Sequence, residues 1–175
     1  MVKLKTMNLG CGRKIMKNAV NLDKRRLKDV DVIHDLEETP LPFKDNEFDI
    51  IFSNHVLEHI KNLIPLMEDL HRITKPHGIL KINVPHFSSF NAYTIDHVRF
   101  FGYGTFRVYE RNKYYGYSVK FKVLKNELNF SKYPRIMIFN WLMNPIINYN
   151  KKFYERFLCW IIPCEEIQFE LEVIK

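Results

Sequence analysis

The chain has 175 residues, of which 46% are hydrophobic and 27% are charged, and its formal net charge is +7. This length and balance predict one globular domain with its own hydrophobic core, and they exclude intrinsic disorder, collagen-like repeats and low-complexity scaffolds. No apolar run approaches the roughly 18 residues that cross a bilayer, and the N-terminus lacks the apolar stretch of a signal peptide. Three cysteines without zinc-type spacing favour a reducing compartment, so we expect a cytoplasmic protein.

Short apolar runs separated by turn residues predict five strands in the first half of the chain. They lie at residues 4–9, 19–23, 31–35, 48–53 and 79–84. Continuous apolar runs of this length are typical of parallel strands that are buried on both faces. Between the last two runs, apolar residues at helical spacing predict a helix that begins near Pro65 and ends before Pro76 and Gly78. A strand, a helix and a strand in this order indicate an α/β sheet.

The excess of positive charge is concentrated in the middle of the chain. Residues 101–150 contain eight basic and two acidic side chains, which supply six of the seven excess charges. This stretch is either a solvated face or a surface for an anionic partner. Aromatic residues interleave with basic ones between 99 and 121, which suits a lid, an acceptor pocket or a surface for single-stranded nucleic acid.

Two stretches in the last third, 119–123 and 167–173, alternate apolar and polar residues. A period of two predicts antiparallel strands with one buried face. If these strands are neighbours, the lysines of the first face the glutamates of the second, and such cross-strand pairs are stabilising. Between them, the aromatic-rich region 137–162 contains Pro145, and Lys151 to Trp160 is expected to be helical. Core packing or a homodimer interface is the expected role of this region, and membrane contact is the lesser alternative.

Three consecutive predicted strands end in residues suited to a nucleoside. The first ends in Gly10-Cys11-Gly12, where the backbone can approach a ligand closely, and the next two end in Asp23 and Asp35. These tips predict a cleft at the carboxyl edge of a parallel sheet. The segment from Gly12 to Asp23 is too short for a full crossover helix, which disfavours a dinucleotide with its pyrophosphate and fits S-adenosylmethionine.

Several motifs of the first hundred residues resemble class I S-adenosylmethionine-dependent methyltransferases, most closely a short subgroup with a reduced first crossover helix. The motifs are Asn8 to Gly12, Asp23, His34 to Leu36, Leu41 to Phe43, Asp45 to Asp49, Val56 to His59, Leu70 to Ile73 and Pro76 to Gly78. The resemblance implies an α/β fold: a Rossmann-like, mostly parallel sheet of seven strands with helices on both faces and an antiparallel last strand. It further implies one methyltransferase-like domain over 1–175, with residues 1–98 as the cofactor-binding half and 99–175 as an acceptor-side lid and antiparallel strands.

The resemblance also implies which residues hold the cofactor, S-adenosyl-L-methionine. The turn lines its methionine moiety, Asp23 holds the ribose, Asp35 and Leu36 bind the adenine, and the residues after the fourth strand close over the sulfonium. The full predicted set is Asn8, Gly10, Cys11, Gly12, Asp23, Asp35, Leu36, Asn54 and His55. Asn8 stands where many members have an acidic residue.

The expected activity is methyl transfer to an unidentified small-molecule acceptor. His86 and His97 are candidate bases for the acceptor's proton, because histidine titrates near neutral pH. Arg99, Arg107 and Arg111 are candidate acceptor-binding residues, which would suit an anionic molecule.

Three alternatives remain open from the sequence. The basic, aromatic segment would also suit a nucleic-acid-binding or RNA-modifying protein on the same fold, although nucleic acid is not the favoured partner. His55, Glu58 and His59 match H-x-x-E-H, a pattern of metal-dependent hydrolases, although no metal is expected because the pattern follows a strand directly. A nicotinamide dehydrogenase is disfavoured by the short first turn.

Overall fold

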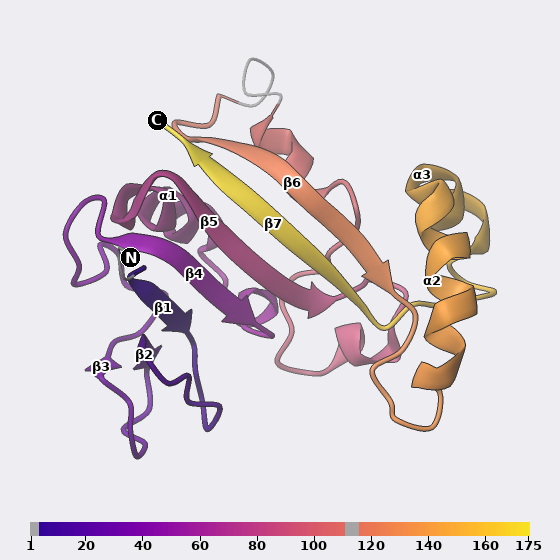
Figure 1. Cartoon of the computed structure of the whole chain (residues 1–175), viewed down its shortest axis with the longest axis horizontal. Coiled ribbons are helices and arrows are strands. Elements are labelled where there is room, and N and C mark those ends of the chain that lie inside the picture. Colours follow the sequence, from indigo (N-terminus) through magenta and orange to yellow (C-terminus); the bar gives the residue numbers. More distant parts are fainter. Residues whose placement is uncertain (1–3, 111–115) are drawn as a thin grey trace.

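The computed structural model describes residues 4–110 and 116–175. Seven strands form a single sheet in the order β3-β2-β1-β4-β5-β7-β6 (Figure 1). The strands are β1 (Thr6–Leu9), β2 (Ala19–Asp23), β3 (Val32–Ile33), β4 (Phe48–Asn54), β5 (Thr74–Pro85), β6 (Lys120–Asn129) and β7 (Glu166–Ile174). The α-helices are α1 (Leu63–Ile73), α2 (Asn140–Tyr149) and α3 (Lys151–Phe153).

Strand directions confirm the predicted sheet. The pairs from β3 to β5 are all parallel, whereas β7 runs antiparallel to both of its neighbours, β5 and β6. Residues 10–18, 24–31 and 34–47 link the first four strands without a helix, so the reduced first crossover is also confirmed. Because parallel strands place their carboxyl ends at one edge, the tips of β1, β2 and β3 lie side by side.

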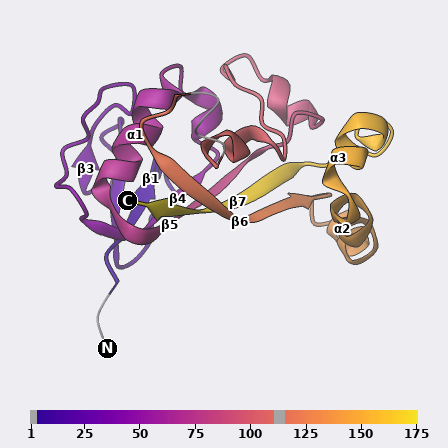
Figure 2. The same ribbon diagram turned by 90° about the horizontal axis from the view of Figure 1, so that it is seen from above.

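The helices that cover the sheet among the described residues lie on one face, whereas the resemblance implied helices on both. Figures 1 and 2 show α1 and the segment 90–109 on the same side of the strands, with the other side open. The covered face of the sheet carries buried side chains such as Ile51, Leu80 and Phe169. The apolar face of α1 that the sequence predicted packs on it, and it consists of Leu66, Met67, Leu70 and Ile73. The loops that replace the first crossover helices are too short to cover the second face.

The open face carries a ladder of opposite charges, which makes it compatible with water. Lys122 lies opposite Glu172, and Lys125 and Lys81 both lie opposite Glu170, on either side of β7. The Nζ of Lys81 is 3.2 Å from Glu170, and that of Lys122 is 4.0 Å from Glu172. The predicted pairing of strand lysines with the β7 glutamates is thus confirmed for Lys122, whereas Lys120 lies opposite Ile174.

Element boundaries differ from the sequence expectation in three places. β1 begins at Thr6, and β3 is reduced to Val32–Ile33. Helix α1 ends at Ile73, but Pro76 and Gly78 are not its stop signals, because β5 begins at Thr74 and contains both. His77 between them adopts a positive φ of 62°, which bends the start of the strand.

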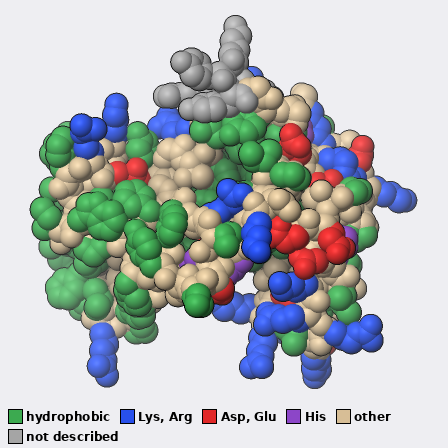
Figure 3. All heavy atoms as spheres, turned by 180° about the vertical axis from the view of Figure 1, so that it is seen from behind, with side chains coloured by type: hydrophobic (Ala, Val, Ile, Leu, Met, Phe, Trp, Pro, Cys, Tyr) green, Lys and Arg blue, Asp and Glu red, His purple; other side chains and the backbone are tan. Residues whose placement is uncertain are grey.

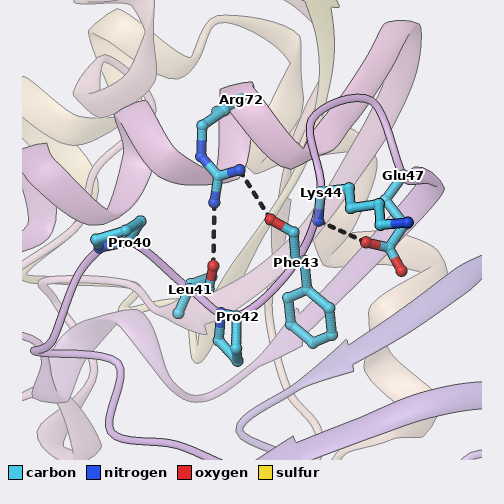
Figure 4. Close-up of a pocket in the computed structure, with 7 residues that line it drawn as sticks. All are labelled: Pro40, Leu41, Pro42, Phe43, Lys44, Glu47 and Arg72. Atoms are coloured by element: carbon cyan, nitrogen blue, oxygen red, sulfur yellow. Dashed lines mark hydrogen bonds between the residues drawn. The ribbon is translucent and has the colours of Figure 1, made fainter.

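The residues that line a hollow beside α1 have a structural role. The guanidinium of Arg72 donates hydrogen bonds to the carbonyl oxygens of Leu41 (3.1 Å) and Phe43 (2.8 Å), and the Lys44 amide donates to Glu47 (2.7 Å) (Figure 4). Since the guanidinium satisfies the loop carbonyls, this hollow fixes the loop before β4. In the described ranges, no helix has the length and apolar character that crossing a membrane requires.

Candidate functional site

A cavity of about 440 Å³ opens at the carboxyl ends of β1, β2 and β4. This volume is within the range of ordinary small-molecule sites. Five of the nine residues predicted for cofactor binding line it: Gly10, Asp23, Asp35, Leu36 and His55. The other lining residues are Lys24, Arg25, Glu37, Val56, His59, Ile60 and Asp96.

The Gly-rich turn after β1 forms one wall of the cavity. Gly10 and Gly12 adopt positive φ angles of 61° and 53°, which other residues rarely take. The amide of Cys11 between them donates to the carbonyl of Leu22 (2.9 Å), which fixes the turn to β2. A Cβ built on Gly10 would lie 2.6 Å from a methyl carbon of Val56, so glycine is also required by packing.

Asp23 is held in place by the turn it faces. Its carboxylate accepts hydrogen bonds from the amide of Gly12 (2.7 Å) and from the amide and Nε of Arg25 (2.9 and 3.1 Å). Burial alone would raise the pKa of Asp23, but these hydrogen bonds outweigh it and the pKa is lowered. The side chain is therefore an ionised acceptor at neutral pH, as ribose hydroxyls require.

The cavity lining is acidic. Four carboxylates (Asp23, Asp35, Glu37 and Asp96) stand against two basic side chains (Lys24 and Arg25). Such a lining suits a ligand that carries positive charge and opposes a pyrophosphate. The dinucleotide alternative is disfavoured by the charge of the cavity as well as by the short turn.

His55 lies at the tip of β4 between two carboxylates. Its Nε2 is 3.2 Å from Glu166 on β7, and its Nδ1 is 3.2 Å from Glu58. The hydrogen bonds to Glu166 and then Glu58 raise the pKa of His55. Both ring nitrogens of His55 thus contact a carboxylate, and the contact with Glu166 links the end of β4 to β7.

Glu58, His59 and His97 form a second cluster beside the cavity. Their side chains place ligand-type atoms within 4.8 Å of one another, which makes them the set among the described residues that could hold a metal ion. The rings of His59 and His97 meet edge to face at 4.7 Å, and the Nδ1 of His59 is 3.3 Å from Asp96. Glu58 Oε2 and His97 Nδ1 are buried without a hydrogen-bond partner among the described residues. His55 is not part of this cluster, because both of its ring nitrogens face carboxylates, so the two histidines of the H-x-x-E-H pattern do not belong to one candidate ligand set.

Several predicted site residues lie outside the cavity lining. Asn8 donates to the carbonyl of Lys14 and to the side chain of Asn21, both at 2.9 Å, and so supports the turn from below. Asn54 lies on the open face of the sheet, where it accepts from Asn83. Cys11 and Gly12 belong to the turn but do not line the cavity.

His86, a predicted base, is fully buried. Its Nδ1 lies 2.8 Å from the Ser88 hydroxyl and accepts from the Ser88 amide, while its Nε2 lies 3.1 Å from Glu155. These partners hold the end of β5 against the segment after α3. His97, the other predicted base, contacts His59, which lines the cavity.

The three predicted acceptor-binding arginines do not form one group. Arg99 donates to the carbonyls of Ile60 and Lys61, which fixes the chain after the Leu57–His59 turn. Arg107 pairs with Glu110 and lines a separate hollow with residues of β6 and α3. Arg111 lies outside the described residues.

Most of the first four strands, and every lining residue of the cavity except Asp96, fall within a stretch that matches a known family. Residues 8–82 match the family described as Methyltransferase domain. Over this stretch, which is less than half of its length, the chain is similar to methyltransferase domains. Among curated proteins, none matches this sequence.

Solved structures show the same fold as this chain along nearly its whole length. The YcgJ protein from Bacillus subtilis is 13% identical with a TM-score of 0.61, over 99% of this chain and 93% of its own. A methyltransferase from Mesorhizobium loti is 13% identical with a TM-score of 0.58, over 97% of this chain and 90% of its own. The cyclase SpnF is 14% identical with a TM-score of 0.60, over 98% of this chain and 74% of its own. Because one of these proteins is a cyclase, the fold alone does not name the acceptor.

The sequence did not predict that His59 and Asp96 would meet in the cavity. His59 drew attention only as part of a metal pattern, and Asp96 only as the neighbour of His97. Their meeting depends on the loop after β5 returning to the Leu57–His59 turn, where the amide of Val98 donates to the carbonyl of Glu58 (2.9 Å). No local pattern signals such a long-range contact.

Proposed function

We propose that this protein binds S-adenosylmethionine in the cavity at the tips of β1 and β2 and methylates a small-molecule acceptor there. The observation that carries the proposal is the cavity that joins a positive-φ glycine turn to carboxylates from two successive strand ends. Asp23 would bind the ribose, and Asp35 with Leu36 the adenine. Residues 1–98 would form the cofactor-binding half, and 99–175 the acceptor side.

The residues present fit this cofactor. The glycine turn leaves the backbone open to close approach, and the acidic lining complements a ligand that carries a sulfonium and an amino group without any phosphate. When bound, S-adenosylmethionine supplies an electrophilic methyl group for an in-line displacement. The task of the chain is then to align the acceptor and to exclude water.

His59 is the best-placed side chain to take the acceptor's proton. It lines the cavity, and Asp96 beside its Nδ1 can orient the ring. His97 packs against it and would receive or relay the proton. Release of S-adenosylhomocysteine in a screen of hydroxyl and amine acceptors would measure this role, and His59→Ala should lower the rate about 100-fold with unchanged cofactor affinity. An unchanged rate would remove His59 from the reaction.

Nucleic-acid binding is not favoured. On the open face, Lys122 and Lys125 of the basic stretch lie opposite glutamates of β7, and the cavity itself is acidic. Binding that required phosphate contacts would weaken steeply with salt. Cofactor binding in the cavity should depend on salt only slightly.

Calorimetric titration with S-adenosylmethionine tests the cofactor proposal. Asp23→Ala removes the ribose acceptor and releases the Gly12 amide, so we expect at least a tenfold loss of affinity. Glu38→Ala is the matched control, because that exposed carboxylate lies close in sequence to Asp35 but outside the lining. Equal affinity of the two variants would contradict the assignment.

A further inference from the structure

Residues 136–162, which we call the helical arm, lie between β6 and β7 at the end of the molecule opposite β1–β3. Figures 1 and 2 show α2 and α3 projecting there, beyond the ends of the strands. The arm comprises a 3-10 turn (Met137–Phe139), α2, α3 and a π-helical turn (Tyr154–Leu158). The cofactor proposal makes no use of it.

The polar side of α2 faces the protein. Asn140, Asn144 and Asn148 follow one another at a spacing of four residues, so they share one face of the helix. Their Oδ1 atoms accept from the amides of Ser131 (3.1 Å), Phe130 (2.8 Å) and Leu128 (2.9 Å), at and just beyond the end of β6. The asparagines thereby satisfy backbone groups that no neighbouring strand could reach.

The apolar side of the arm consequently faces outward. Trp141, Tyr149, Trp160 and Ile161 are 75%, 93%, 67% and 75% exposed. Further exposed apolar side chains of the arm are Ile136, Met137, Ile138, Phe139, Leu142, Ile146, Phe153 and Phe157. Figure 3 shows this concentration of hydrophobic side chains at the left of the view. An apolar surface of this density marks an interaction site in a stable protein.

The charges around this surface are basic. Lys132, Arg135, Lys151, Lys152 and Arg156 lie in or next to the arm, and none forms an ion pair with a residue that the structure describes. Glu155 is the one acidic residue of the arm, and its carboxylate points inward to the Tyr103 amide (2.5 Å) and His86 (3.1 Å). The outward charge is therefore entirely positive.

We propose that the helical arm docks on the surface of an anionic lipid bilayer. Exposed tryptophans and aliphatic side chains flanked by lysine and arginine are the composition of helices that lie in a membrane interface. The ten residues of α2 are half of the roughly 20 that a spanning helix needs, so the arm lies on the bilayer rather than crossing it. This inference is independent of the cofactor proposal.

A second copy of the chain is the main alternative occupant. A twofold interface would bring the same five unpaired basic side chains of two copies together, and like charges at an interface are unfavourable. Anionic headgroups instead neutralise them. Charge complementarity thus favours the bilayer over a homodimer.

The two tryptophans of the chain, Trp141 and Trp160, both lie in the arm and report directly on its surroundings. We expect their fluorescence to shift to shorter wavelength when phosphatidylglycerol-containing vesicles are added, and to be quenched by lipids brominated in the acyl chain. The protein should sediment with these vesicles and remain in the supernatant with pure phosphatidylcholine. Raising the salt concentration should release it.

Two pairs of variants test which side chains are responsible. Lys152→Glu with Arg156→Glu reverses two charges and keeps the apolar surface, and should weaken vesicle binding at least tenfold. Ile138→Ser with Ile161→Ser removes two exposed apolar side chains and should have a similar effect. Lys28→Glu and Ile64→Ser, which are exposed changes outside the arm, should bind vesicles as the wild type does.

Absence of vesicle binding by the folded wild type would overturn the proposal, as would a concentration-dependent dimer whose formation the arm variants abolish while vesicle binding is absent. Binding that the control variants lose as strongly as the arm variants would also overturn it. Circular dichroism establishes that each variant is folded. Because the charge-reversal pair changes only exposed side chains, it keeps the test decisive if the apolar pair fails to fold.

Discussion

The strand tips and the helical arm use the same residue type in opposite ways. At the tips, Asn8 and Asn21 are buried beneath the glycine turn, where the side chain of Asn8 donates a hydrogen bond to that of Asn21. In the arm, Asn144 and Asn148 bind the end of β6 and turn the apolar side of α2 outward. The difference shows that unpaired backbone groups of an edge strand can decide which side of a helix faces the protein, because the polar side of the helix supplies their hydrogen bonds.

His86 joins the end of β5 to the arm, and its replacement should have the largest effect on stability. The fully buried ring lies between Ser88 and Glu155, so His86→Ala leaves a cavity and removes one partner of the Glu155 carboxylate. We expect a loss of about 2–4 kcal/mol in the free energy of unfolding, measured in urea. His77→Asn is the control, because that exposed histidine has a positive φ that asparagine tolerates. A fully stable His86→Ala protein would mean that this ring does not hold the arm against the end of β5.

At the strand tips, Gly10→Ala tests whether the turn is fixed by packing. The new Cβ would meet Val56 at 2.6 Å in a backbone conformation with a φ of 61°. We expect a loss of about 2–3 kcal/mol in unfolding free energy, together with weaker cofactor binding. Gly104→Ala should have little effect, since nothing lies within 4 Å of its added Cβ and its φ is negative. Equal stability of the two variants would contradict the packing of the turn.

In the arm, one substitution on each side of α2 tests which side of the helix faces the protein. Asn148→Ile removes a side chain that bonds both the amide and the carbonyl of Leu128, and should cost about 1–3 kcal/mol. Ile146→Asn places an amide on the outward side, where the residue is half exposed, and should change stability by less than about 0.5 kcal/mol. Thermal unfolding of both proteins measures the difference. The reverse order of stabilities would show that the apolar side faces the protein.

The smallest effect concerns the contact of His55 with Glu166. The folded-state pKa of His55 is raised by its carboxylate partners, so its contribution is fully present below the unfolded pKa of about 6.5 and is lost as pH rises through the folded value. The pKa of Glu166 is lowered chiefly by the hydrogen bond to His55, so acid removes the contact as well. His55→Gln should therefore cost about 1 kcal/mol more at pH 6 than at pH 9. A cost independent of pH would contradict the ion pair.

Much of the parallel part of the sheet could be predicted from the sequence. Strands buried on both faces are read from continuous apolar runs, and each run before residue 85 corresponds to a strand of the sheet. The expected helices on the second face are absent from the described ranges because the loops there are too short, a fact that the spacing from Gly12 to Asp23 already indicated. The start of β5 was missed because Pro76 and Gly78 are ordinary stop signals for a helix.

The candidate site was predicted less completely. Gly10, Asp23 and Asp35 follow from their place at strand ends, whereas His59 and Asp96 meet through a loop whose path no local pattern fixes. His86 looks like a base in the sequence because burial cannot be read there. The orientation of α2 could not be predicted either, because its asparagines are recognised as the inward side only from their hydrogen bonds to the end of β6.

The central claim is that the cavity at the strand tips is the cofactor site. A crystal structure of the protein with S-adenosylhomocysteine at saturating concentration tests it most directly. We predict the ribose on Asp23 and the adenine beside Asp35 and Leu36, with the amino-acid end against the turn at Gly10. A nucleoside bound elsewhere, or none at saturation, would contradict it.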